Sequence, residues 1–294
     1  MALYTLNNGE LQLKVADCGG VIEGLWWQHE GLALPLLRTG LQSGVAVESS
    51  CFPLVPFGNR VSGNRFSSAA GEYQLHPNVA WDDHYLHGDG WLNVWHGLAQ
   101  SPTQLTLEYV HRQGVYHYTA QQHFTLTGNA LMVELVVTNE SEATLPFGLG
   151  WHPYFPLTPQ TKLQADANGY WLEREQWLAG EFQSQIPPEL DFNHPSPLPQ
   201  RWVNNAFSGW DGRATIDQPE LGYRLSLTTE PPAPCYFIFV SDPEFDRGYA
   251  FDFFCIEPMS HAPDDHHRSE FGQLTLISTG ESMRQQMTLQ VYVP

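Results

Sequence analysis

Short stretches of alternating apolar and polar residues recur along this chain, and they predict a fold built from β-strands. The longest stretch runs from Leu131 to Val137, and Gly128-Asn129 separates it from another apolar segment, Phe124–Leu126. A period of two residues places successive side chains on opposite faces of a sheet, and Gly-Asn is a typical hairpin turn. We therefore expect an antiparallel hairpin here with one buried face.

Further strands are expected wherever the same alternation or a continuous apolar run occurs, namely at residues 11–15, 21–27, 104–109, 223–227, 236–240, 249–256 and 287–293. The best helix candidate is short, Trp171–Ala179, and the five prolines between Pro187 and Pro199 predict an exposed extended loop. The 25 glycines and 22 prolines indicate frequent turns. Together these features favour a β-sandwich or barrel. No composition break divides residues 1–294, so we expect a single domain.

The charge of the chain limits its partners. Thirteen basic residues stand against 32 acidic ones, a formal net charge of −19 at pH 7. Such a surface repels nucleic acids and anionic membranes, and it favours a neutral small-molecule ligand. The four cysteines form no CxxC pair, and Cys235 and Cys255 are predicted to be small core residues. The start of the chain has no signal-peptide pattern, and no run of 18 apolar residues occurs, so we expect a soluble cytoplasmic protein.

The segment Tyr249–His267 combines an apolar run with a dense group of polar residues. The run predicts a buried strand that delivers Glu257 at its end, with Pro258 preventing its continuation. Taken alone, Glu257 is more simply explained as a charge at a strand end that faces water. The five polar residues that follow have metal-capable side chains: His261, Asp264, Asp265, His266 and His267. Adjacent histidines cannot point to one side of a strand, and no HExxH spacing occurs, so we predict a polar loop and no metal.

Four other segments place polar side chains beside glycine and proline. Arg60 follows a Pro/Gly turn, and its role is either a structural ion pair or a ligand contact. His87 lies before a glycine. It is either a ligand contact or a residue of a surface turn. His152 lies among aromatic residues, either as a core histidine or as a proton-transfer group that titrates near neutrality. The segment 203–211 offers Asn204 and a carboxylate, Asp211, within an ordinary turn sequence.

Taken together, these segments resemble the aldose 1-epimerase (galactose mutarotase-like) family. The shared motifs occur in the same order from Leu11 to Val293: an arginine after a Pro/Gly turn at Arg60, Leu-His-Gly at His87, Gly-x-x-x-His-x-Tyr-Phe at His152, Asn-x-x-Phe at Asn204 and Cys-x-Glu-Pro at Glu257. Two positions depart from the common pattern. Asp89 stands where a second glycine is usual after the histidine, and Asn204 stands where aspartate is usual. Both departures bear on the sugar rather than on the reaction.

The resemblance implies a large antiparallel β-sandwich, a galactose mutarotase-like supersandwich with few short helices. It implies interconversion of the α and β anomers of a free neutral aldose, with Glu257 as general base and His152 as general acid. His87 and Arg60 would hold sugar oxygens, and Asn204 would replace a sugar-binding aspartate. Opening a hemiacetal removes a proton from the C1 hydroxyl and supplies one to the ring oxygen, which suits a carboxylate and an imidazolium. No metal or other cofactor is needed.

Two alternatives remain. A hexose-6-phosphate 1-epimerase on the same fold would need two or more basic residues near the phosphate, and beside the motifs the sequence offers little besides Arg60 and Arg65. A non-catalytic carbohydrate-binding protein could use the same sandwich, since a fold does not imply a function. A binding protein has no need of the Glu257–His152 pair, which favours the enzyme.

Overall fold

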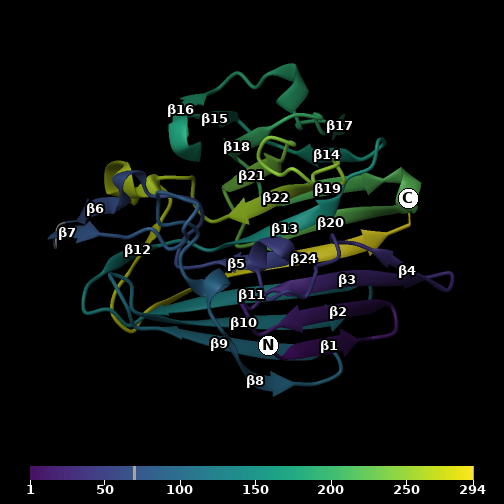
Figure 1. The fold of residues 1–294 in the computed structure, drawn as a ribbon, viewed down its shortest axis with the longest axis horizontal. Helices are drawn as coiled ribbons and strands as arrows, with labels where there is room; N and C mark the ends of the chain where they lie inside the picture. The colour runs from purple at the N-terminus through teal and green to yellow at the C-terminus, as the bar shows by residue number, and fades with distance from the viewer. Residues whose placement is uncertain (69–70, 294) are drawn as a thin grey trace.

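Two large antiparallel sheets pack face to face in the computed structural model, which describes residues 1–68 and 71–293 (Figure 1). The helical segments of the described residues are 3-10 turns of three residues each: η1 (Ala46–Glu48), η2 (Ser62–Asn64), η3 (Gly90–Leu92), η4 (Glu175–Trp177), η5 (Pro188–Leu190), η6 (Pro219–Leu221), η7 (Asp265–His267) and η8 (Ser269–Phe271). None of them is long and apolar enough to span a membrane. The predicted all-β sandwich with few short helices is confirmed.

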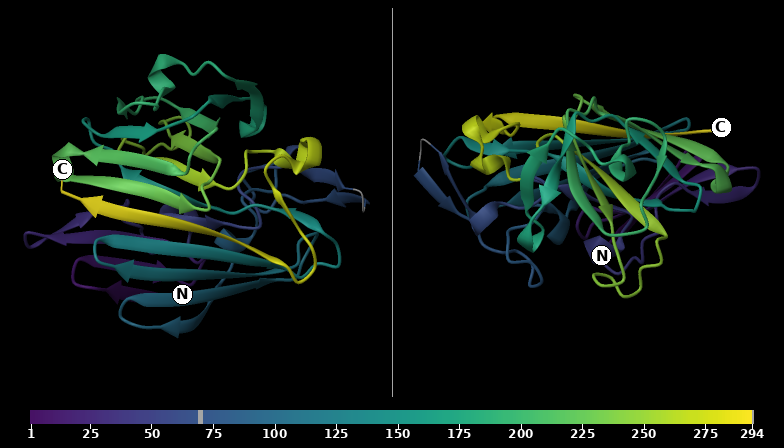
Figure 2. Two further views of the ribbon diagram at one scale, coloured as in Figure 1. Left: turned by 180° about the vertical axis from the view of Figure 1, so that it is seen from behind. Right: turned by 90° about the horizontal axis from the view of Figure 1, so that it is seen from above.

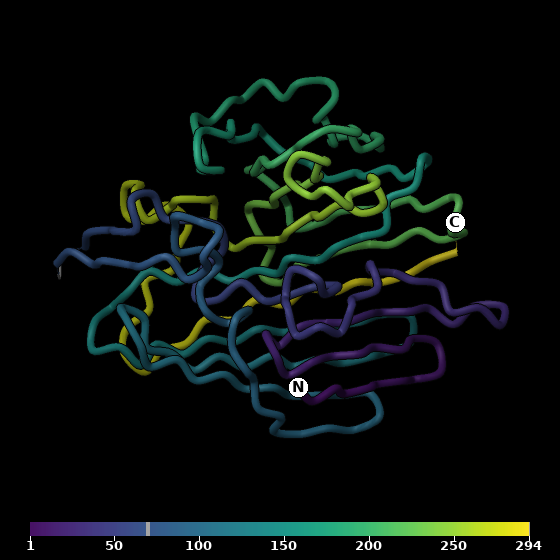
Figure 3. Tube along the Cα trace, in the orientation of Figure 1, coloured from purple at the N-terminus to yellow at the C-terminus, as the bar shows by residue number. Residues whose placement is uncertain are grey.

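The larger sheet carries the centre of the molecule. Among the described residues its strands run, in spatial order, β1 (Leu3–Asn7), β2 (Leu11–Ala16), β3 (Ile22–His29), β5 (Cys51–Leu54), β13 (Gly150–Pro156), β22 (Phe253–Met259), β21 (Cys235–Val240), β18 (Val203–Ser208), β15 (Gly169–Glu173) and β16 (Ala179–Gln183), with β4 (Leu32–Pro35) paired to β3. Figure 3 shows how this order brings the early, middle and late parts of the chain side by side in β5, β13 and β22.

The second sheet covers one face of the first, as the two views of Figure 2 show. Its spatial order is β17 (Ser196–Pro197), β14 (Lys162–Ala165), β19 (Arg213–Gln218), β20 (Tyr223–Glu230), β24 (Ser282–Tyr292), β11 (Ala130–Asn139), β10 (Tyr118–Thr127), β9 (Gln104–His111) and β8 (His96–Gln100). Two small pairs complete the described strands: β12 (Leu145–Phe147) with β23 (Thr275–Ile277), and β6 (Arg65–Ser68) with β7 (Gly71–Gln74).

The second sheet follows the predicted alternation closely. Strands β10 and β11 bury every second residue, and they pair from Tyr118↔Asn139 to Thr127↔Ala130 around the Gly128-Asn129 turn. The predicted hairpin is therefore confirmed. The buried positions, such as Leu131, Val133 and Leu135, point into the core between the sheets, where their exposure falls to 0%. The alternation arises because one face of this sheet packs on the core while the other faces solvent.

The centre of the larger sheet is buried on both faces. All seven residues of β22 and all four residues of β5 are buried, and so are the first six of β13. One face packs against the second sheet. The other face is covered by loops, which enclose the candidate site described below. This double burial explains why these strands read as continuous apolar runs instead of alternating ones.

Three predictions about elements were wrong in detail. Trp171–Ala179 is not a helix, because strand β15, the turn η4 and the start of β16 occupy it. The strand predicted at 249–256 begins at Phe253, because Phe251 has a left-handed φ of 55° that no extended strand accommodates. That strand also continues through Pro258 to Met259, so Glu257 lies inside a strand rather than at its end.

The proline-rich segment between Pro187 and Pro199 was expected to form an exposed extended loop, and this is only partly correct. It contains the turn η5 and the two-residue edge strand β17. Its apolar residues Leu190 and Phe192 are 4% and 1% exposed and belong to the core. Prolines occupy the loop and the sheet edge, where no ladder hydrogen bond is lost.

Candidate active site

The pairing of β13 with β22 brings His152 and Glu257 together. Gly150 pairs with Met259 and Tyr154 with Cys255, so His152 stands directly opposite Glu257 midway between these pairs. Pro153 and Pro258 lie in the same interval and lack the N–H that a continuous ladder requires. Directly opposed residues of an antiparallel pair project their side chains on the same face of the sheet. The register thus joins two residues that are far apart in the chain.

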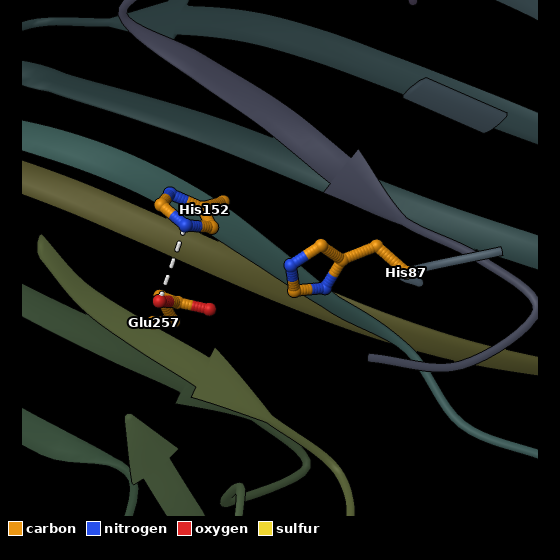
Figure 4. A group of neighbouring side chains, drawn as sticks. All are labelled: His87, His152 and Glu257. Atoms are coloured by element: carbon orange, nitrogen blue, oxygen red, sulfur yellow. Dashed lines mark ion pairs between the residues drawn. The ribbon is translucent and has the colours of Figure 1, made fainter. Parts of the chain in front are cut away.

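The two side chains are in contact. His152 Nε2 lies 3.2 Å from Glu257 Oε1, as the dashed line in Figure 4 marks. His152 is 8% exposed and Glu257 is 2% exposed. The ring of Phe52, the cross-strand partner of His152 on β5, stacks on the imidazole with centroids 4.5 Å apart. Glu257 Oε2 is buried and has no hydrogen-bond partner within the described residues, so it can accept one from a ligand.

His87 lies beside His152 and Glu257 and comes from a loop rather than from a strand. One ring nitrogen of His87 faces the His152–Glu257 pair in Figure 4. Its Nδ1 accepts the backbone N–H of Asn59 at 3.0 Å, so in the neutral ring the proton is on Nε2. Its backbone is left-handed at φ 56°, and the following Gly88 is left-handed as well, at φ 67°. His87 is buried, which excludes the surface-turn interpretation.

Arg60 is both ion-paired and exposed to the cavity. Its guanidinium contacts Asp82 Oδ2 through Nη2 at 2.6 Å and through Nε at 2.8 Å. Asp82 is itself fixed by the backbone N–H of His84, and both partners are buried. The ion pair holds the arginine head in one orientation beside Glu257. The two explanations considered for Arg60 are therefore compatible.

A cavity of about 610 Å³ opens beside this group, and all five residues predicted to form the site line it. They are Arg60, His87, His152, Asn204 and Glu257. The Nδ2 of Asn204 donates to Glu173 Oε1 at 2.6 Å, which fixes its amide at the cavity wall. A volume of this size lies within the range of about 300–1,000 Å³ that is typical of small-molecule sites.

Burial controls the proton affinities of the pair. Burial raises the pKa of Glu257 well above its ordinary value, and the Arg60 guanidinium partly opposes this. Burial, followed by the positive charge of Arg38, lowers the pKa of His152 to about 3. Burial and the neighbouring His152 lower the pKa of His87 well below its ordinary value. In the ligand-free cavity, burial therefore favours the protonated form of Glu257 and the neutral forms of His152 and His87.

The ligand-type atoms of His87, His152 and Glu257 lie within 4.8 Å of one another in the described structure, close enough to surround a metal ion. The hydrogen bond from Asn59 to Nδ1 makes Nε2 of His87 a proton donor. A nitrogen that carries a proton cannot coordinate a cation. The donor set therefore fits sugar oxygens better than a metal.

The segment 261–267 forms a mostly buried structural loop beside the site and does not line the cavity. His261 Nε2 accepts the backbone N–H of Gly58 at 3.0 Å, and His266 contacts the hydroxyl of Tyr116 at 3.0 Å. Asp265 Oδ2 accepts the backbone N–H groups of Ala262 and Gln273, both at 2.9 Å. These contacts fix the loop that follows β22, in agreement with the predicted polar loop.

Two further polar residues of the sequence motifs, Asp89 and Asp211, make structural contacts. Asp89, the departure after Gly88, accepts the Tyr85 hydroxyl and lies 3.3 Å from His111, and it does not line the cavity. Asp211 Oδ1 accepts the backbone N–H of Arg213 at 3.0 Å, which is the ordinary turn contact. Neither Asp89 nor Asp211 therefore lines the cavity.

Sequence reasoning missed several residues of the cavity wall. Arg38 is the most notable: its guanidinium stacks 3.7 Å from the Tyr154 ring centroid and donates to the carbonyl of Val47 at 2.8 Å. Phe52, Trp81 and Phe245 also line the cavity. The scarcity of basic residues in this chain was the one available signal for Arg38. The aromatic residues gave no signal, because they are equally common in the core.

Comparisons with known proteins agree with this arrangement. Residues 2–290 match the family model for aldose 1-epimerase. An Escherichia coli K12 protein named as uncharacterized protein YphB is 63% identical over 291 residues, covering 99% of each chain. A crystal structure from the same organism, described provisionally as an aldose 1-epimerase, is 62% identical, with a TM-score of 0.97 over 100% of this chain and 99% of that one.

A more distant structure shares the fold alone. The GalM/aldose epimerase homologue of Caenorhabditis elegans is 16% identical, with a TM-score of 0.84 over 99% of each chain. The sandwich is thus of the galactose mutarotase-like type. With the family model spanning nearly the whole sequence, this chain belongs to the aldose 1-epimerase family.

Proposed function

We propose that this protein is an aldose 1-epimerase that interconverts the α and β anomers of a free neutral aldose by general acid–base catalysis. The observation that carries the proposal is the 3.2 Å contact between His152 Nε2 and Glu257 Oε1 at the wall of a cavity of about 610 Å³. The two reacting oxygens of an aldopyranose, the C1 hydroxyl and the ring oxygen, are bonded to the same carbon. Two titrating groups side by side can each contact one of them.

The reaction consists of two proton transfers and one bond cleavage. The carboxylate of Glu257 removes the proton from the C1 hydroxyl, and the electron pair of that O–H bond forms the carbonyl. The bond between C1 and the ring oxygen breaks, and the ring oxygen takes a proton from His152. Rotation about C1–C2 presents the other carbonyl face, and the reverse transfers close the ring. Groups placed for such transfers typically contribute about 10²–10⁴-fold each.

The proton count of the pair fits this scheme. In the ligand-free cavity burial favours the protonated form of Glu257, because it raises the pKa of the carboxyl. Sugar hydroxyls that donate to Glu257 favour the carboxylate, as does the Arg60 guanidinium. Substrate binding therefore shifts the proton across the 3.2 Å contact to His152, which becomes the acid without a change in the total number of protons.

The remaining predicted residues hold the sugar. His87 Nε2 carries a proton and donates to a sugar oxygen, because Nδ1 is occupied by Asn59. Arg60 is oriented by Asp82 and offers a further N–H donor at the cavity wall. Asn204, with its amide nitrogen engaged by Glu173, presents its carbonyl oxygen as an acceptor for a sugar hydroxyl.

A phosphorylated sugar is the second candidate substrate. Arg38 and Arg247 line the cavity together with Arg60, and neither has a carboxylate within ion-pair distance among the described residues. Glu48 and Asp246 line the same cavity and oppose a phosphate. We rank this candidate below the neutral sugar. Comparing the mutarotation of glucose with that of glucose 6-phosphate separates the two.

Polarimetry of freshly dissolved α-anomers tests the proposal. We expect the protein to accelerate the mutarotation of at least one of glucose, galactose and xylose, without added metal or nucleotide. Sugar binding by calorimetry without any rate enhancement would instead establish a carbohydrate-binding protein. A lack of both binding and acceleration across the screen would remove the proposed function.

A further inference from the structure

The loop that carries His87 is attached to the second sheet next to the site. His87 and Gly88 both have a left-handed backbone, and the backbone N–H of the following residue, Asp89, donates to the carbonyl of Val55 at 3.2 Å. The hydroxyl of Tyr118, on β10 of the second sheet, donates to the same carbonyl at 3.3 Å. The turn that orients His87 therefore shares one acceptor with the opposite sheet.

The side chain of Asp89 adds a second connection to that sheet. Its Oδ2 accepts the hydroxyl of Tyr85 and lies 3.3 Å from Nε2 of His111, the last residue of β9. His111 Nδ1 contacts the hydroxyl of Tyr109 at 2.7 Å, and the His111 ring stacks on Tyr118 with centroids 5.2 Å apart. The carboxylate thus connects the loop of His87 to both β9 and β10.

This buried polar group contributes more to geometry than to stability. The side chains of Asp89 and His111 are 13% and 12% exposed. Burial raises the pKa of Asp89, and His111 and then Tyr85 oppose this. A buried contact between a carboxylate and an imidazole adds little net stability, because desolvation offsets the attraction. A polar network whose members all have partners does, however, hold them in one arrangement.

The orientation of His87 depends on contacts on both sides of Gly88. Before it, the amide Nδ2 of Asn78 donates to the carbonyls of Leu86 and Gly88 at 2.9 and 2.7 Å. After it, Asp89 fixes the chain through the contacts described above. Glycine permits wide rotation of the backbone, so contacts on one side alone do not define the direction of the His87 ring.

We propose that Asp89 is a positioning residue for His87, through which His111 and the second sheet set the affinity of the site for the sugar. The inference rests on the proposed mutarotase function, in which His87 Nε2 donates to a sugar oxygen. Asp89 does not line the cavity, so it acts on the sugar through His87. The glycine that is usual at this position in the family has no side chain to make these contacts.

The proposal separates binding from catalysis. Loss of the Asp89 carboxylate displaces the His87 donor and leaves Glu257 and His152 in place. A group that holds the sugar equally in the ground state and the transition state affects KM and not kcat. We therefore expect a weaker sugar complex with an unchanged proton-transfer step.

A double-mutant cycle tests this proposal, with the sugar whose mutarotation the wild-type protein accelerates best. Asp89→Ala should raise KM about three- to tenfold, the effect of misplacing one hydrogen-bond donor, and should leave kcat within about twofold. His87→Ala should raise KM by at least as much. In the His87→Ala background, Asp89→Ala should have no further effect on KM, because the group that it positions is gone.

Three further variants separate positioning from stability. Asp89→Asn keeps an acceptor for the Tyr85 hydroxyl and should raise KM less than Asp89→Ala does. Tyr223→Phe is the matched control, because Tyr223 is 1% exposed and its hydroxyl donates to the carbonyl of Pro35 at 2.7 Å, a contact between the sheets away from the cavity. It should lower the melting temperature and leave KM unchanged. If Asp89→Ala does not fold, His111→Phe takes its place in the cycle, because it keeps a ring against Tyr118 and removes the nitrogen that faces Asp89.

Two kinds of failure are distinguishable. A KM unaffected in the Asp89 or His111 variant, a lower kcat with an unchanged KM, or additive effects in the cycle overturn the positioning role and leave the mutarotase function intact. If the wild-type protein accelerates no sugar, the mutarotase function fails and the positioning role fails with it.

Discussion

Single side chains in this protein derive their chemistry from burial more than from their own type. Glu257 is an ordinary carboxylate in sequence, yet at 2% exposure its pKa is raised well above the usual range. His152 was singled out because histidine titrates near neutrality, whereas burial and Arg38 lower its pKa to about 3. The sequence identified both residues correctly as cavity residues. It did not indicate their protonation, which depends on solvent exclusion.

The first prediction concerns catalysis at these two residues. Glu257→Gln and His152→Asn should each lower kcat/KM for mutarotation by at least about 10²-fold, because each removes one of the two groups proposed to transfer protons. Gln keeps the shape of Glu257, whereas Asn is shorter than the imidazole and lacks the Nε2 atom that contacts Glu257. His123→Asn, a histidine that contacts Thr106 away from the cavity, is the control and should retain full activity. Near wild-type rates in either active-site variant would exclude that residue from the mechanism.

The second prediction concerns stability and pH. An unfolded glutamate releases its proton near pH 4.3, whereas buried Glu257 retains it to higher pH, so ionisation of the unfolded chain lowers stability as pH rises. Glu257→Gln removes this loss. Relative to wild type, the variant should gain about 1.4 kcal/mol for each unit by which burial has raised the pKa.

Urea unfolding at pH 4 and at pH 8 measures this effect. The difference in unfolding free energy between Glu257→Gln and wild type should shift in favour of the variant at the higher pH. An equal difference at both values would show that the folded carboxyl ionises at an ordinary pKa.

At the scale of elements, the turn formed by His87 and Gly88 determines where the His87 ring lies. Gly88 has φ +67°, and a Cβ built on it would overlap the carbonyl group of Val55. An alanine here is strained in its backbone and also displaces Val55, the residue directly after strand β5, which carries Phe52. The position of the His87 ring therefore depends on a glycine beside it.

The third prediction follows from this contact. Gly88→Ala should lower the unfolding free energy by more than the cost of about 1–2 kcal/mol for a left-handed alanine, and it should raise KM for the sugar. Gly31→Ala is the control, because Gly31 also has a positive φ, +78°, but no heavy atom lies within 4 Å of a Cβ there. Equal destabilisation of the two variants, measured by thermal unfolding, would contradict the steric argument.

Strands with one solvated face were predicted well, because alternation directly records which face is buried. The hairpin of β10 and β11 is the clearest case. The doubly buried strands were predicted less accurately. Their apolar runs do not mark where the extended backbone begins, as the left-handed Phe251 shows. Pro258 does not end β22, because the hydrogen-bond ladder between β22 and β13 is already interrupted at that position.

At the scale of the whole molecule, the net charge of −19 affects substrates through the long-range field. The fourth prediction is that KM for a neutral sugar changes little between low salt and about 0.5 M salt. A sugar phosphate should instead bind better as salt rises, since salt screens its repulsion from the protein. Polarimetric KM values at three ionic strengths measure this. A phosphate KM that rises with salt would show that Arg38 and Arg247 dominate the field in the cavity.

The sequence by itself determined that this protein is built from β-strands, and its motifs selected five residues that share one cavity. Alternation and turn residues are local properties, so they can be read without the fold. The tertiary structure alone decided that His152 meets Glu257, because strand register sets contacts between distant positions. It also decided the proton affinities of the pair and the roles of Arg38, Trp81 and Phe245 in the cavity wall. These properties depend on which surfaces exclude water, and only the packing of the complete chain determines that.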